Sequence, residues 1–178
     1  ERFVLRKIAK AVAKIKYGRQ KSISLGDIKS KRDWGHAKDY VRMQWLMLQQ
    51  EKPEDFVIAT GRMETVRRFI ELSASILGWN SKDDEPAIIW EGKGINEVGR
   101  RADTKEIVIR IDPKYFRPAE VDQLIGDPSK AYKKLGWKPS INLEKLVVEM
   151  INEDKKIVKA ENILSEKGFR FNKSLKTI

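Results

Sequence analysis

The residues best suited to chemistry in this sequence are an arginine and a glutamate three residues apart, Arg117 and Glu120, in the stretch YFRPAEVD. Pro118 fixes its own φ angle and favours an extended backbone at the arginine before it. The guanidinium can then offer paired donors to a phosphate, while the carboxylate accepts hydrogen bonds from sugar hydroxyls. This pairing is typical of a nucleotide site, but a surface ion pair in a turn explains the spacing equally well.

Two further cations occupy positions where an anion can bind. Arg32 comes directly before Asp33, Trp34 and a predicted helix, so it can meet a phosphate, although an Arg–Asp pair beside a core tryptophan is the plainer alternative. Lys7 falls near the start of another predicted helix, where free backbone N–H groups favour anions, but most such lysines are simply solvated. We interpret His36, at the start of the helix after Trp34, as a hydrogen-bonded structural residue.

Composition narrows the class of protein. The 178 residues include no Cys and one His, which excludes disulfides, Cys-ligated zinc and a thiol nucleophile and argues against a His-based triad or a structural metal. Lys and Arg number 37 against 26 Asp and Glu, for a net charge of +11, but they are spread along the whole chain. We therefore do not expect nucleic-acid binding. The sequence has neither a membrane-length apolar run nor a signal-peptide pattern, so we expect no membrane association and a cytoplasmic protein.

Hydrophobic periodicity predicts alternating helices and short strands, which define an α/β fold. The predicted helices are residues 2–17, 40–50 and 65–77 and a long helix that begins after Asn142. The predicted strands are residues 22–25, 56–60, 87–90 and 106–112. The helix at 40–50 is expected to be largely buried and fixed to its neighbours by Lys38 and Asp39, and residues 99–103 are expected to form a mobile basic loop.

The stretch GDPSKAYKKLGWKP predicts a short helix with a purely structural role. Asp127 can cap it and Pro128 suits its first position. Gly136 supplies a left-handed end, and Pro139 prevents continuation.

A second glycine pattern invites a cofactor interpretation, which we reject. Gly92 and Gly94 form G-x-G, but Glu97 stands where a dinucleotide fingerprint has its third glycine, and no helix clearly follows.

The motifs together resemble a known family. GDPSKAYKKLGWKP and the RDW at Arg32 are similar to the extended short-chain dehydrogenases that act on nucleotide sugars. FVIATG, at residues 56–61, and YFRPAEVD are narrower and resemble GDP-mannose 4,6-dehydratases, the bacterial branch in particular. The resemblance covers nearly the whole chain and is poorest at residues 81–105.

The resemblance implies roles for five residues. Val4 and Lys7 are similar to helix residues that line the GDP pocket, Arg32 and Arg117 to the pair that holds the diphosphate, and Glu120 to the ribose contact. No catalytic residue of the family is found, because its Tyr, Lys, Ser/Thr and Glu and its glycine-rich NADP turn belong to an N-terminal Rossmann half. The chain is therefore expected to be the C-terminal substrate-binding part, with a nucleotide-sugar-binding domain at 1–160 and a peripheral helix and tail at 161–178.

For the complete protein the resemblance implies conversion of GDP-mannose to GDP-4-keto-6-deoxymannose, the first step toward GDP-fucose or GDP-rhamnose. NADP would take a hydride from C4 and return it to C6, while water leaves across C5 and C6. The implied partners are GDP-mannose, the N-terminal half and further copies in a homodimer or homotetramer. Two alternatives stay open: another epimerase or reductase of nucleotide sugars, and a non-catalytic binding module.

Overall fold

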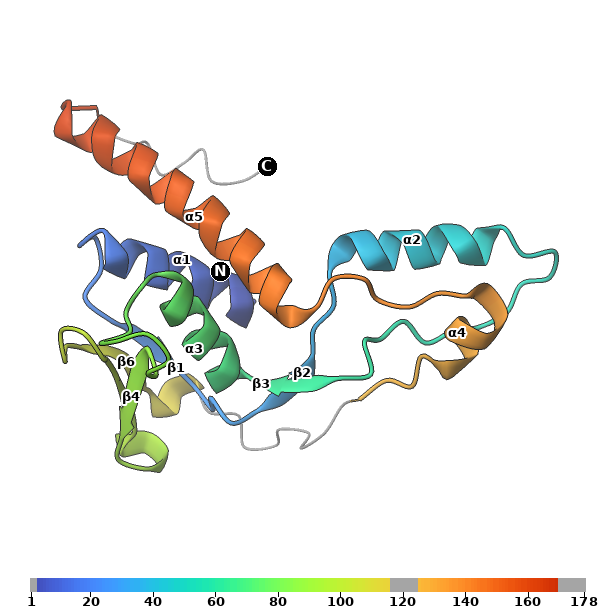
Figure 1. Ribbon diagram of the computed structural model, residues 1–178, viewed down its shortest axis with the longest axis horizontal. Helices are drawn as coiled ribbons and strands as arrows, with labels where there is room; N and C mark the ends of the chain where they lie inside the picture. Colours follow the sequence, from blue (N-terminus) through green and yellow to red (C-terminus); the bar gives the residue numbers. More distant parts are fainter. Residues whose placement is uncertain (1–2, 116–124, 170–178) are drawn as a thin grey trace.

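The computed structural model describes residues 3–115 and 125–169 and has two sheets (Figure 1). The larger has four strands in the order β1 (Ile23–Leu25), β6 (Ile107–Ile111), β5 (Val98–Arg101) and β4 (Ile88–Glu91). β1 pairs with β6 in parallel and the other pairs are antiparallel. The smaller sheet pairs β2 (Lys31–Asp33) with β3 (Met63–Thr65) in antiparallel register.

Three helices pack on one another to form the main body: α1 (Val4–Lys16), α3 (Val66–Ile76) and α5 (Leu143–Glu166) (Figure 1). Their apolar faces meet the four-stranded sheet in one core, which is centred on Ile8, Phe69, Ile109 and Ile151. This is the α/β arrangement that the sequence predicts.

A second, smaller cluster lies beside this body (Figure 1). α2 (Ala37–Leu48) and α4 (Ser129–Leu135) enclose Met43, Ala131 and Trp137, and Phe56 and Ile58 pack against them. We call α2, α4 and the segment 56–60 the arm.

Helix ends follow the predicted signals. Thr65 caps α3 and Asn142 caps α5, each by accepting a hydrogen bond from a backbone N–H three residues on. Gly136 ends α4 with a φ of 61°. Asp127 accepts from the backbone N–H and hydroxyl of Ser129, as a cap would. The N-cap position itself belongs to Pro128, so α4 begins one residue later than predicted.

The prediction that the helix at 40–50 is largely buried is wrong. In α2 only Asp39 and Met43 are buried, while Val41, Trp45 and Leu48 are 62%, 59% and 82% exposed. These three residues form a stripe along one side of the helix, opposite the small cluster. The apolar pattern predicts two covered faces, and the described residues cover one of them.

The predicted strand at 56–60 is also absent. No backbone hydrogen bond of Phe56, Val57, Ile58 or Ala59 is found within the part of the chain that the structure describes. Alternate side chains nevertheless point to opposite sides: Phe56 and Ile58 join the small cluster, whereas Val57 and Ala59 meet Gly126. The segment has the side-chain pattern of a buried strand without a neighbouring strand to pair with.

Two smaller differences concern the ends of elements. Residues 98–101 form β5 rather than a mobile loop, because they pair with both β4 and β6. α5 continues through residue 166, so the helix expected to begin at 161 is its last part. Among the described residues, no helix is long and apolar enough to cross a membrane.

Candidate functional site

The strand order places a lysine at the edge where two parallel strands end. β1 and β6 finish side by side at Leu25 and Ile111, so their carboxyl ends share one edge. Lys7, in the first turns of α1, reaches this edge, where its Nζ donates a 2.8 Å hydrogen bond to the carbonyl oxygen of Ser24. The same Nζ lies 4.1 Å from the ring centroid of Tyr115, which follows β6.

Two opposing effects act on the pKa of this lysine. Partial burial lowers the pKa of Lys7 from its usual value, and attraction to Asp112 opposes that effect. Electrostatic attraction is stronger where water is partly excluded. An ammonium held at this edge, with donors beyond the one used by Ser24, can bind an anionic oxygen. Sequence reasoning proposed Lys7 as a candidate but did not select Ser24, Asp112 or Tyr115, which lie around it. The predicted strands at 22–25 and 106–112 were the available signal.

Arg32 lies on β2, in the smaller sheet, where its guanidinium donates to the Lys31 carbonyl at 2.7 Å. The adjacent Asp33 has a different role from the Arg–Asp pair that the sequence left open as an alternative. Its carboxylate accepts from the backbone N–H groups of Thr60 and Gly61 at 2.9 to 3.0 Å and from the Thr60 hydroxyl at 2.5 Å. Asp33 therefore joins the strand that carries Arg32 to the end of the segment 56–60.

Of the other three predicted site residues, only Val4 lies within the described ranges. Val4 lies one turn before Lys7 and packs, half-buried, against the main core. Arg117 and Glu120 lie outside the described residues.

His36 and Asp39 hold α2 in place, as predicted. His36 caps the helix by accepting from the Lys38 backbone N–H, and its Nε2 lies 3.2 Å from Glu149. The Asp39 carboxylate accepts from Ser140 and Ile141. Both side chains are more than nine-tenths buried and both anchor the arm to the chain around α5, which is a structural task.

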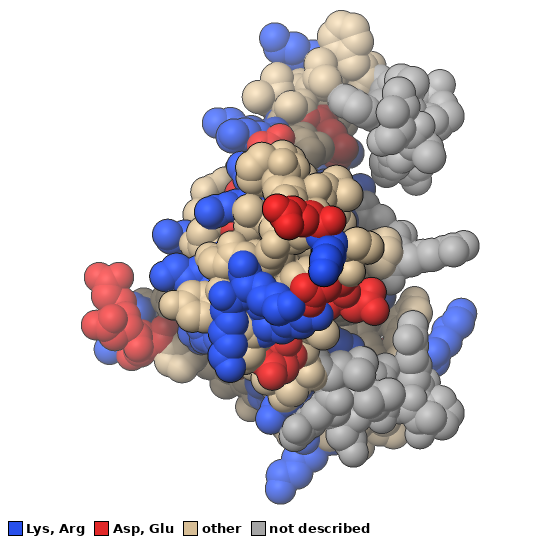
Figure 2. Space-filling model, turned by 90° about the vertical axis from the view of Figure 1, so that its right-hand side faces the viewer, with Lys and Arg blue, Asp and Glu red and all other residues tan. Residues whose placement is uncertain are grey.

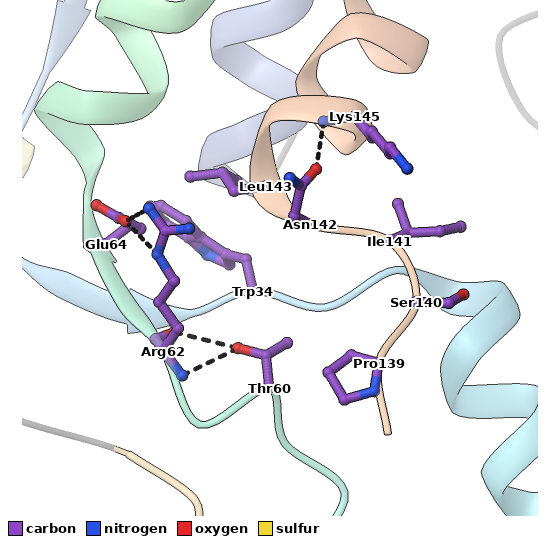
Figure 3. Close-up of a pocket in the computed structure, with 10 residues that line it drawn as sticks. All are labelled: Trp34, Thr60, Arg62, Glu64, Pro139, Ser140, Ile141, Asn142, Leu143 and Lys145. Atoms are coloured by element: carbon purple, nitrogen blue, oxygen red, sulfur yellow. Dashed lines mark hydrogen bonds and ion pairs between the residues drawn. The ribbon is translucent and has the colours of Figure 1, made fainter. Parts of the chain in front are cut away.

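A cavity of about 200 Å³ lies between β3, the end of the segment 56–60 and the start of α5 (Figure 3). Trp34 forms part of its wall, and Arg62 and Glu64 face each other on one side. Val4, Lys7 and Arg32, the three predicted site residues that the structure describes, do not line it. Because Glu64 and Glu144 both pair with Arg62, the cavity presents a neutralised cation rather than a free one.

Charge is also dense on the end of the molecule where the arm lies. Figure 2 looks at this end and shows Lys and Arg side chains gathered over the middle of the face, with Asp and Glu among them. Lys130 and Lys134 both pair with Glu54, at 3.0 and 2.6 Å. Their hydrogen bonds lower the pKa of the Glu54 carboxyl. These are paired, exposed charges of the kind that contributes little to stability.

The G-x-G stretch lies in a tight turn between β4 and β5. In the G-x-G stretch, Gly94 opens a single 3₁₀ turn, and a Cβ at Gly92 would lie 2.5 Å from the Asn96 carbonyl oxygen. Glu97 is buried and paired with Arg67. The G-x-G stretch thus forms a tight turn and does not open an α-helix. No group of three or more His, Cys, Asp or Glu residues that could hold a metal ion occurs in the ranges described.

Comparison with solved structures shows which known proteins share this fold. RMD from Pseudomonas aeruginosa, complexed with NADPH, aligns with a TM-score of 0.66 and 21% identity over 87% of this chain and 43% of that chain. A UDP-glucose 4-epimerase from Bifidobacterium longum aligns with a TM-score of 0.60 and 18% identity over 86% of this chain and 39% of that chain. The fold is one found in the epimerase and dehydratase branch of the short-chain dehydrogenases.

Sequence comparison narrows this class to one family. The family model described as GDP-mannose 4,6 dehydratase matches residues 1–150. The chain is 48% identical to the GDP-mannose 4,6-dehydratase of Yersinia enterocolitica over 179 aligned positions, which cover 95% of this chain. It is 50% identical to the human GDP-mannose 4,6 dehydratase over 157 positions, which cover 88% of this chain. The chain belongs to the GDP-mannose 4,6-dehydratase family. It spans 46% and 40% of these two relatives, or about half of their length.

Proposed function

We propose that this chain is the C-terminal, GDP-sugar-binding part of a GDP-mannose 4,6-dehydratase. Family membership carries the proposal, and the position of Lys7 supports it, because an ammonium at the carboxyl edge of parallel strands suits the diphosphate of a nucleotide sugar. In this proposal Lys7, Arg32 and Arg117 contact the GDP moiety, Val4 lines its pocket and Glu120 holds the ribose.

The task of this part is to bind and orient. In the complete protein NADP, held by an N-terminal Rossmann half, supplies the hydride chemistry that turns GDP-mannose into GDP-4-keto-6-deoxymannose. The residues of this chain grip the GDP end, far from the reacting sugar carbons. Binding energy from such a remote group positions the sugar and lowers the entropic cost of reaction.

The arm supports the existence of a partner half that contains a sheet. The segment 56–60 is extended and apolar on both sides, yet the backbone groups of residues 56–59 have no hydrogen-bonded partner within the described chain. Beside it, the stripe of Val41, Trp45 and Leu48 is exposed. Exposed strand edges and contiguous apolar surface both favour association. In the cytoplasmic homodimer or homotetramer that we propose, the Rossmann half covers this surface.

Calorimetric titration of the 178-residue chain tests the binding role. We expect GDP-mannose and GDP to bind competitively and UDP not to compete. Arg117→Ala should weaken GDP-mannose by about 10- to 100-fold, because charge-assisted hydrogen bonds to a phosphate are lost. The matched control is Arg110→Ala, an exposed strand arginine that should bind like the wild type. A loss in Arg117→Ala of less than about threefold would count against the proposal.

A complementation assay tests the reaction. The chain is co-expressed with the N-terminal part of the Yersinia enterocolitica relative, and GDP-mannose and NADP are supplied. We expect a 4-keto-6-deoxy product. An epimerised or reduced product would identify a different nucleotide-sugar enzyme, and nucleotide binding without any product would favour a non-catalytic module.

A further inference from the structure

Three elements that are distant in the sequence meet around the amine of Lys7. Lys7 comes from α1, Ser24 and Gly26 from the end of β1, and Tyr115 from the turn after β6. Ser24 accepts the hydrogen bond of the amine and Tyr115 lies under it. The contact therefore depends on how closely the turn after β6 approaches the end of β1.

Gly26 permits this approach. A Cβ at this position would lie 2.3 Å from the carbonyl oxygen of Tyr115 and 3.2 Å from its Cβ, so any larger residue would push the turn away. Gly26 does not have a positive φ, so its backbone conformation does not require glycine. The requirement comes from the contact with Tyr115 alone.

The Tyr115 ring is well placed to hold a cation. The Lys7 Nζ lies 4.1 Å from the ring centroid, within the range of an attractive cation–π contact. The backbone of Tyr115 packs directly against Gly26, which fixes the position of the ring. The residue is nevertheless 48% exposed. A lysine has a flexible four-carbon side chain, and the carbonyl of Ser24 alone would leave its remaining donors free to rotate.

We propose that Tyr115 is a positioning residue for Lys7. Gly26 sets how closely the Tyr115 backbone approaches the end of β1. The ring and the Ser24 carbonyl together orient the amine, so that its remaining N–H donors face the proposed nucleotide site at the carboxyl ends of β1 and β6. The role of Tyr115 in nucleotide binding rests on the proposed function. The contact between the Tyr115 ring and the Lys7 amine does not depend on it.

Competitive acetylation of the chain across a pH series, read by peptide mass spectrometry, measures the hold on the amine. In Tyr115→Leu the burial remains but the ring attraction is lost, so the midpoint for Lys7 should fall by about half a pH unit, a threefold loss of basicity. Tyr115→Phe keeps the ring and should match the wild type. Lys156, with a side chain 76% exposed on α5, is the internal control and should not shift in any variant.

Gly26→Ala provides a second route to the same result, because it displaces the turn and leaves the ring chemistry unchanged. It should shift Lys7 in the same way as Tyr115→Leu. Identical Lys7 profiles in the wild type, Tyr115→Leu and Gly26→Ala would overturn the proposal.

Titration with GDP then tests whether positioning matters for binding. Tyr115→Leu should bind about threefold more weakly than Tyr115→Phe. Equal affinities, despite a shifted acetylation profile, would refute the positioning role. If the wild type itself binds no GDP, the proposed function fails, and the acetylation profiles alone decide whether Tyr115 holds the amine.

Discussion

The buried carboxylate of Asp39 offers the sharpest test of how the arm is attached. It accepts hydrogen bonds from the Ser140 backbone N–H at 2.9 Å, the Ser140 hydroxyl at 2.6 Å and the Ile141 backbone N–H at 2.9 Å. The backbone oxygen of Asp39 also accepts from the Trp137 indole at 2.9 Å. A single residue thus ties α2 to the chain between α4 and α5.

The expected cost follows from these bonds. Asp39→Ala leaves three donors without their acceptor, at about 1 kcal/mol each, so the free energy of unfolding should fall by about 3 kcal/mol. Asp39→Asn keeps one oxygen for the two backbone donors, and the Ser140 hydroxyl can rotate to accept from the new amide. Only the charge assistance is then lost, which should cost about 1 kcal/mol.

Urea denaturation followed by circular dichroism measures these losses, and hydrogen exchange at the Ser140 and Ile141 amides shows whether the arm opens first. Ser140→Ala, which removes one of the three donors, is the matched control and should cost about 1 kcal/mol. A loss below about 1 kcal/mol in Asp39→Ala would refute the reasoning.

The same carboxylate predicts a pH dependence. Burial raises the pKa of Asp39, but hydrogen bonds from Ser140 and Ile141 outweigh it and the pKa lies below its usual 3.8. A lowered carboxyl pKa gives stability that is complete above the unfolded value and is lost as the pH falls through the folded one. Below pH 3.8 the wild type should therefore lose stability more steeply than Asp39→Asn.

Three further predictions concern the arm. Gly136→Ala should cost about 1 kcal/mol in urea denaturation, because its φ of 61° strains a side chain; equal stability of wild type and variant would contradict this, and Lys138→Ala is the control. Met43→Ala, at a fully buried position, should cost about 2 to 4 kcal/mol in the same assay, and a cost under about 1 kcal/mol would mean that the small cluster is not a packed core. Trp45→Ser, at an exposed position, should change stability by less than about 0.5 kcal/mol and reduce self-association in light scattering. Unchanged association would contradict the proposal that the exposed stripe on α2 is an association surface.

The elements predicted correctly are those whose signals are local. α1 and α3 combine helical apolar spacing with a terminal glycine, at Gly18 and Gly78, and each glycine has the expected positive φ. β6 was recognised from its apolar run Ile107–Ile111, although its burial does not alternate strictly, since Val108 and Ile109 are both buried. Such signals lie within a dozen residues and do not depend on what the rest of the chain does.

The failures arise where the partner of an element decides its structure. The apolar runs of 56–60 and of α2 predict burial on both sides, but burial requires neighbours that the described residues do not supply. Residues 99–101 read as a loop because Gly99 and two arginines have poor strand propensity, yet pairing on both sides makes them a strand.

The site was predictable only in part. The family resemblance and the helix-start argument both selected Lys7, and the strands at 22–25 and 106–112 were recognised. That these strands lie parallel and adjacent, and so bring Ser24 and Tyr115 to the amine, is a property of the sheet order. Residues of such different sequence position are joined by topology, which periodicity cannot reveal.

The packing of α1 against α5 has a consequence during synthesis. The Arg6 guanidinium pairs with the buried Asp154 carboxylate at 2.6 Å across 148 residues of sequence. At about 5 to 20 residues per second, a ribosome needs roughly 7 to 30 seconds to cover that distance. During this interval the apolar face of α1 and the strand β1 are exposed in the nascent chain, because α5 and β6 have not yet been synthesised. A chaperone that binds exposed apolar segments would raise the yield of folded protein at this stage.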